Sequence, residues 1–158
     1  MSFGQSFQIT PVIMLRAAAA IVNGGKLVTP HFAVKAAGAD GETVQEFCYE
    51  TVTDAITEET SNTMKDILRQ VVEDGGGINA FIEGFSIGGK TATSQKLPRG
   101  SGKYIASFVG FSSVDNPRVI AMCLIDEPQG VYYGGTIAAP VIRELFENIL
   151  PYLEIYPN

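Results

Sequence analysis

The chain has 158 residues, of which 46% are hydrophobic and 18% are charged, a composition typical of one globular domain or of part of a larger one. The 17 acidic residues exceed the 11 basic residues and give a net charge of −6, which argues against a nucleic-acid partner. The longest apolar run, at residues 119–125, is too short to span a bilayer, so no membrane contact is expected of this segment.

The number and spacing of the histidine and cysteine residues exclude further classes of site. A single histidine, His31, excludes a multi-histidine metal site and disfavours a Ser-His-Asp triad. It follows a proline in an extended stretch, which favours a structural role. Cys48 and Cys123 form no C-x-x-C pair, so we expect two buried thiols rather than a disulfide. No metal or cofactor is expected. The N-terminus lacks the basic and apolar regions of a signal peptide and suggests a piece of a longer protein.

The first third of the sequence predicts a helix and a hairpin. The helix is predicted to begin with Thr10 as its N-cap and to end at the glycines 24–25, because apolar residues recur between them at helical spacing. Residues 26–35 and 44–52 are then predicted to be the two strands of a hairpin, with the turn at residues 40–41.

The middle of the chain predicts a second helix and three strands. The helix runs from an N-cap at Thr57 to the glycines 75–77. Its apolar residues fall at i, i+3, i+4, i+7 and i+8: Met64, Ile67, Leu68, Val71 and Val72. Short connections predict that the strands at 85–95, 104–111 and 119–126 form an antiparallel meander. The last of them is apolar on both faces, which is typical of a central strand.

A last helix is predicted from Thr136 to Pro151, with one apolar stripe. The order of elements is therefore helix, hairpin, helix, three strands and helix. That order indicates an α+β fold in which helices flank an antiparallel sheet.

One segment departs from the usual pattern of a strand interior, because Gly88 and Gly89 are followed directly by Lys90. Glycines at such positions indicate close approach of another backbone or of a ligand, and a lysine among hydroxyls can receive a carboxylate. The alternative is a glycine bulge on an edge strand that the lysine protects. Gly84 and Gly89-Lys90-Thr91 also match a nucleotide-binding P-loop formally, but the residues that follow disfavour the helix a P-loop requires.

Residues 90–95, Lys-Thr-Ala-Thr-Ser-Gln, resemble the Lys-Thr-Gly-Thr-Ala-Gln strand in the transpeptidase domain of class B penicillin-binding proteins. The resemblance covers nearly the whole chain and is greatest to sporulation- and division-type members from Gram-positive bacteria. Further similar motifs follow in the family's order: Gly4-Gln5, Ile9-Thr10-Pro11, Asn23-Gly24-Gly25, residues 104–111, Asp115-Asn116-Pro117, Asp126-Glu127-Pro128, Tyr133-Gly134-Gly135-Thr136 and Ala138-Ala139-Pro140.

The resemblance implies a serine β-lactamase-like fold and D,D-transpeptidation, in which a serine attacks the D-Ala-D-Ala amide of a peptidoglycan stem peptide and forms an acyl-enzyme. It implies catalytic roles for Lys90 and Thr93, the backbone N–H of Thr93 being an oxyanion donor. It implies that Thr91, Ala92 and Gln95 bind the substrate strand, and that Lys90 and Thr91 hold its terminal carboxylate. Stem peptides and β-lactams are the implied ligands, on the extracytoplasmic side of the cell membrane.

Three features depart from the family pattern. No serine is followed by lysine three residues later, and no Ser-x-Asn motif is present. We therefore expect residues 1–158 to be the C-terminal portion of a transpeptidase domain, inactive alone. Ala92 stands where the family has glycine, and its methyl should share a face with Lys90.

The alternatives are a non-catalytic homologue that serves as a binding or scaffold module and an unrelated α+β domain. A Ser-x-x-Lys motif upstream of the chain would favour the enzyme. We also expect self-association, because the strand at 119–126 carries no lysine or proline that would protect an exposed edge.

Overall fold

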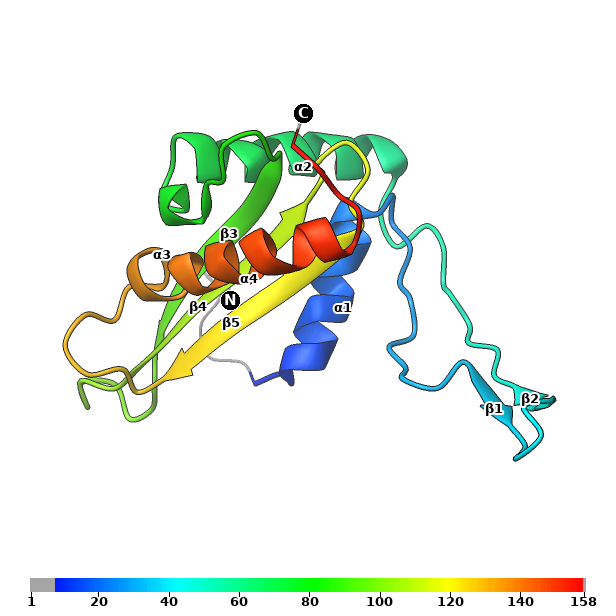
Figure 1. Ribbon diagram of the computed structural model, residues 1–158. Coiled ribbons are helices and arrows are strands. Elements are labelled where there is room, and N and C mark those ends of the chain that lie inside the picture. Colours follow the sequence, from blue (N-terminus) through cyan, green and yellow to red (C-terminus); the bar gives the residue numbers. More distant parts are fainter. Residues whose placement is uncertain (1–7, 158) are drawn as a thin grey trace.

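A computed structural model describes residues 8–157 as an α+β fold, as predicted from the sequence (Figure 1). The Gly4-Gln5 pair lies outside the described residues. The elements, in chain order, are α1 (Pro11–Val22), β1 (Lys35–Ala37), β2 (Thr43–Glu46), α2 (Glu58–Glu73), the 3-10 helix η1 (Ile78–Ala80), β3 (Ile87–Gln95), β4 (Tyr104–Ser112), β5 (Val119–Asp126), α3 (Gly134–Ile137) and α4 (Ala139–Tyr152). No helix in residues 8–157 is long and apolar enough to cross a membrane.

The main sheet is the predicted antiparallel meander, with the strand order β3-β4-β5. The pairing of β3 with β4 runs without interruption from Ile87 opposite Ser112 to Gln95 opposite Tyr104. Lys90 therefore lies inside a strand. Since no helix begins at this lysine, the P-loop interpretation is wrong.

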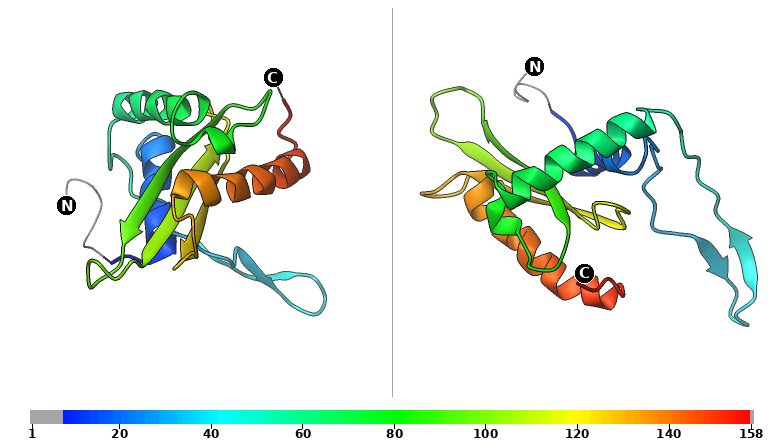
Figure 2. Two further views of the ribbon diagram at one scale, coloured as in Figure 1. Left: turned by 90° about the vertical axis from the view of Figure 1, so that its left-hand side faces the viewer. Right: turned by 90° about the horizontal axis from the view of Figure 1, so that it is seen from above.

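Helices cover both faces of this sheet (Figure 2). On one face, α3 and α4 pack over β4, and the side chains of Phe108, Ile142 and Phe146 are completely or almost completely buried between them. On the other face, α1 and α2 contact the sheet around Val22 and Phe111. This packing explains why β5 has apolar residues on both faces, since α1 packs on one face and α4 on the other.

The helix boundaries follow from local chemistry. The Oγ1 of Thr57 accepts a hydrogen bond from the Thr60 N–H at 3.1 Å and caps α2 as predicted. Thr10 has the extended backbone of an N-cap, but its side chain makes no capping bond. The predicted last helix is divided into α3 and α4, because Pro140 favours a new helix start. Pro151 does not end α4 but lies in its last turn.

The predicted hairpin forms an arm that projects from the body of the molecule (Figure 1). Its strands β1 and β2 are much shorter than predicted, and every residue in them is exposed, so no packed face sustains a longer ladder. His31 stacks on Tyr49 with ring centroids 3.8 Å apart, a structural contact within the arm. Cys48 and Cys123 are free thiols as expected, but Cys48 is exposed and Cys123 only half-buried, so the prediction of burial is wrong.

The outer edge of β5 is open in the described part of the chain. The Glu127 N–H donates to the Tyr104 carbonyl at 2.9 Å, which fixes the alternation of the ladder between β4 and β5. By that alternation the backbone groups of Ile120, Met122 and Leu124 point away from β4, and no strand among residues 8–157 pairs with them. The sequence expectation of self-association through this edge stays a prediction.

Candidate functional site

The site residues expected from the sequence all lie on β3, the other edge strand of the described sheet. Lys90 and Ala92 are exposed and line an apolar cavity of about 420 Å³ between the sheet, α1 and α2. The Ala92 methyl therefore shares a face with Lys90, as the alternation of a strand predicts. Thr91 and Thr93 are half-buried on the opposite face, beside α3.

The hydrogen-bond ladder determines which backbone groups of β3 face outward. The Ser113 N–H donates to the Ser86 carbonyl at 2.8 Å, and the Lys96 N–H donates to the Lys103 carbonyl at 2.9 Å. These bonds bracket β3 and place its even-numbered residues in the ladder with β4. The backbone groups of Thr91, Thr93 and Gln95 consequently point to the outer edge, where no strand of the described chain pairs with them.

The Lys90 amine lies at this same edge. Its Nζ donates to the Thr91 carbonyl at 2.6 Å, and within residues 8–157 it forms no ion pair. An ammonium group held by one neutral carbonyl keeps donors for an incoming anion. The edge of β3 thus combines a lysine amine with the outward N–H of Thr93, which is the donor set that a peptide carboxylate and an oxyanion require.

The glycines before Lys90 have a structural cause. A Cβ on Gly88 would lie 2.3 Å from the Phe111 ring, and a Cβ on Gly89 would lie 2.4 Å from the Phe108 ring. Rings of the neighbouring strand thus occupy the space that side chains would fill. The pairing shows no bulge between β3 and β4, so the alternative of a glycine bulge is wrong. The expected close approach of another backbone is found at Gly89, where a Cβ would also lie 2.7 Å from the Val109 carbonyl oxygen.

A second glycine pair, Gly134 and Gly135, allows α3 to pack closely against the site. The Gly134 N–H donates to the Oγ1 of Thr93 at 3.1 Å. A Cβ on Gly134 would meet the carbonyl oxygens of Ser107 and Ala92 at 2.2 and 2.4 Å, and a Cβ on Gly135 would meet the Gly76 carbonyl at 2.1 Å. Only residues without a side chain allow α3 to approach β3 this closely. Sequence reasoning identified the pair as a motif but missed its contact with Thr93.

Two further clusters near the end of β3 were also missed. The Tyr104 and Tyr132 rings stack with centroids 4.0 Å apart and an angle of 8°. Hydrogen bonding to Tyr132 raises the pKa of the neighbouring Tyr133 hydroxyl. The signal in the sequence was an aromatic pair next to a glycine pair, but nothing in it pointed to Tyr104, which is 28 residues before Tyr132.

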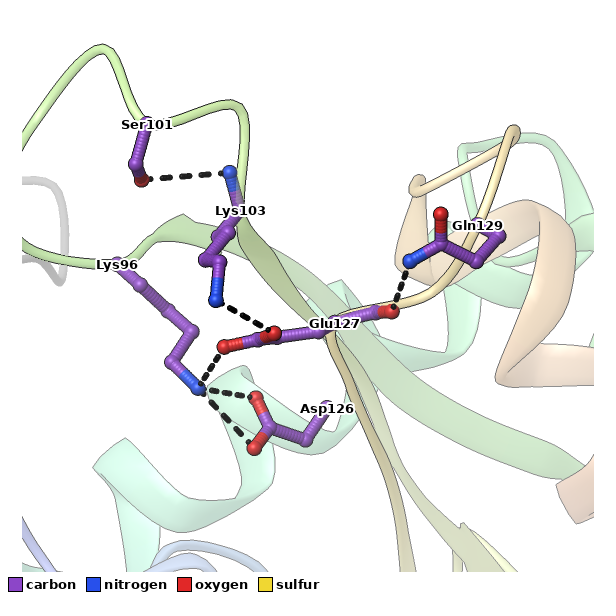
Figure 3. A network of polar contacts seen from close by, with 6 residues as sticks. All are labelled: Lys96, Ser101, Lys103, Asp126, Glu127 and Gln129. Carbon is purple, nitrogen blue, oxygen red and sulfur yellow. Dashed lines mark hydrogen bonds and ion pairs between the residues drawn. The ribbon is translucent and has the colours of Figure 1, made fainter.

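The other cluster is a network of ion pairs among Lys96, Lys103, Asp126 and Glu127 (Figure 3). Hydrogen bonds from Lys96 and then from Lys103 lower the pKa of the Glu127 carboxyl. Hydrogen bonds to Glu127 and then to Asp126 raise the pKa of the Lys96 amine. Charges at the ends of three strands gave no spacing signal, because their proximity depends on the register of the sheet.

Comparisons with known proteins place this geometry in a family. The model of the penicillin binding protein transpeptidase domain matches residues 1–147. Stage V sporulation protein D from Bacillus subtilis is 37% identical over 162 residues, which cover 99% of this chain and 25% of that protein. A probable peptidoglycan D,D-transpeptidase, PenA, from Neisseria flavescens is 33% identical over 163 residues and covers 100% of this chain and 38% of its own length.

Solved structures support the same assignment. Penicillin binding protein 3 from Mycobacterium tuberculosis, complexed with ampicillin, superposes with a TM-score of 0.84 at 25% identity over 98% of this chain and 37% of its own. Its complex with aztreonam gives a TM-score of 0.83. The chain thus spans between about a quarter and two fifths of these relatives. By its sequence, its fold and the order of its motifs, the chain belongs to the transpeptidase-domain family of class B penicillin-binding proteins.

Proposed function

We propose that β3 is the strand on which a peptidoglycan D,D-transpeptidase binds the D-Ala-D-Ala end of a stem peptide. The observation that carries the proposal is the outer edge of β3, where the amine of Lys90 and the outward N–H of Thr93 lie together and no strand of residues 8–157 pairs with them. An extended peptide can add to such an edge through main-chain hydrogen bonds. Lys90 and Thr91 would then hold its terminal carboxylate, with Ala92 and Gln95 beside the peptide.

The reaction would proceed through an acyl-serine. The serine adds to the carbonyl carbon between the two D-alanines, the oxyanion accepts a hydrogen bond from the Thr93 N–H, and the terminal D-alanine leaves with a proton on its amine. The amine of a second stem peptide then displaces the serine. No Ser-x-x-Lys motif is present in this sequence, so in the proposal another segment of the transpeptidase supplies the nucleophile. The cross-linking of stem peptides by the transpeptidase would take place outside the cytoplasm.

Titration with a fluorescent acyl-Lys-D-Ala-D-Ala peptide tests the binding half of the proposal. Fluorescence anisotropy should show binding of the free carboxylate, and the C-terminal amide should bind about ten times more weakly, the factor expected for one charge-assisted hydrogen bond. Lys90→Met should remove this preference, whereas Lys35→Met on the projecting arm should keep it. Equal affinity for acid and amide in the unaltered chain would contradict the proposal.

Labelling with a fluorescent penicillin tests the other part of the proposal, that the nucleophile lies outside this chain. The chain alone should show no covalent band on a denaturing gel, because it has a carboxylate site without the nucleophile motif. A stoichiometric adduct on any serine would show that this chain carries its own nucleophile.

A further inference from the structure

The four charged residues at the end of the sheet connect all three strands (Figure 3). Lys96 follows β3 directly, Lys103 precedes β4, and Asp126 and Glu127 lie at the end of β5. The Lys96 amine contacts the Asp126 carboxylate at 2.9 Å and the Glu127 carboxylate at 2.8 Å. Lys103 reaches the second oxygen of Glu127 at 3.0 Å, so Glu127 bridges the two lysines on either side of the β3–β4 loop.

Glu127 has a strained backbone conformation, which other interactions of the residue must stabilise. Its φ is +51°, in the left-handed region that non-glycine residues seldom occupy. This conformation turns the chain out of β5, while the Glu127 N–H still bonds the Tyr104 carbonyl and the carboxylate reaches back to both lysines. The ion pairs thus hold the first residue of the β5–α3 loop, residues 127–133, in one position.

The other end of this loop reaches the candidate site. Near its end, the Tyr132 ring rests on the ring of Tyr104, the first residue of β4. Directly after it, the Gly134 N–H donates to the Oγ1 of Thr93 at 3.1 Å. The loop is therefore fixed at its start by Glu127 and at its end by Thr93, with an aromatic contact between them.

We propose that Glu127 is a positioning residue for Thr93, and that Lys96 and Lys103 act with it. By holding the start of the β5–α3 loop against the ends of β3 and β4, Glu127 keeps the Gly134 N–H on the Thr93 hydroxyl and so fixes the segment of β3 that presents the Thr93 N–H. The inference rests on the proposed function of β3, and it assigns a role in that site to charges that touch no substrate.

Hydrogen exchange of the Gly134 amide, followed by NMR in the 158-residue chain, tests the link directly. Glu127→Gln removes both ion pairs of this residue, so exchange at Gly134 should become faster by at least the factor of about two to five that one surface ion pair supplies. Glu147→Gln is the matched control, because it breaks an exposed Arg143–Glu147 pair of similar length on α4. It should leave Gly134 exchange unchanged.

Two results would overturn the proposal: unchanged Gly134 exchange in Glu127→Gln, or an equal acceleration in α4, which would indicate general destabilisation. If Glu127→Gln does not fold, Lys103→Met carries the same test, because it removes only one of the two ion pairs on Glu127. Peptide titration separates the two proposals. Glu127→Gln should weaken acyl-D-Ala-D-Ala binding about two to five times and Glu147→Gln should not. An unaltered chain that binds no peptide contradicts the function of β3, whereas the exchange result still decides whether Glu127 holds Gly134.

Discussion

Replacement of Gly135 by alanine should destabilise the protein although alanine normally favours a helix. In a helix interior the exchange would gain about 1 kcal/mol. Here the new Cβ would lie 2.1 Å from the Gly76 carbonyl oxygen and 3.2 Å from the Thr91 Cγ2, so α3 must move away from the turn between α2 and η1 that holds Gly76. Overpacking against backbone costs about 1–3 kcal/mol. At the upper end of that range, the net loss is about 2 kcal/mol.

Gly76→Ala is the matched control for this prediction. A Cβ at Gly76 would find its nearest atom, the Thr91 Oγ1, at 3.9 Å, and the residue does not have a left-handed backbone. Its stability should stay within about 0.5 kcal/mol of the unaltered chain. Urea unfolding followed by circular dichroism should show a midpoint about 1 M lower for Gly135→Ala alone. Equal midpoints for the two variants would show that the close contact of Gly135 with the Gly76 carbonyl does not limit stability.

Three further predictions concern other parts of the molecule. Ser112→Ala should leave stability unchanged or raise it by up to about 1 kcal/mol in urea unfolding, because the buried hydroxyl has no partner among the described residues; a clear loss would reveal one. Hydrogen bonds from Lys96 and Lys103 lower the pKa of Glu127 from its ordinary value, so its stabilising contribution is complete above that ordinary value and is lost as the pH falls through the lower folded pKa. Thermal melts of Glu127→Gln should therefore show a smaller loss on the acid side, and an unchanged profile would count against the ion pairs. Light scattering across a dilution series should show self-association through β5, and Leu124→Lys, at a 44% exposed edge position, should reduce it; a monodisperse unaltered chain at high concentration would count against the open edge.

Much of the fold could be predicted because its signals are local. The cap at Thr57 and the apolar spacing after it predict α2, and short turns between apolar runs predict the order of β3, β4 and β5. The interruption at Pro140 and the short strands of the arm were missed, because the first depends on one proline inside an apolar pattern and the second on the lack of a packed face.

In the candidate site, too, the features with a local signal could be predicted and those that depend on distant residues could not. Residues 90–95 were singled out by their resemblance to one strand of the family, which can be recognised in six consecutive residues. The interaction of Gly134 with Thr93, and that of Glu127 with Lys96, join residues 41 and 31 positions apart, and only the sheet register brings them together. The rings that fill the space beside Gly88 and Gly89 were not foreseen for the same reason, since they belong to the next strand.

Mapping of the bound peptide on β3 tests the central claim most directly. In a ¹H–¹⁵N spectrum of the 158-residue chain, an acyl-D-Ala-D-Ala peptide should shift the amide signals of Thr91, Thr93 and Gln95, whose N–H groups face the open edge, more than those of Lys90 and Ala92, whose N–H groups are in the ladder with β4. Binding that shifts signals elsewhere and leaves the odd-numbered residues of β3 unchanged would contradict the assignment of this strand to the substrate.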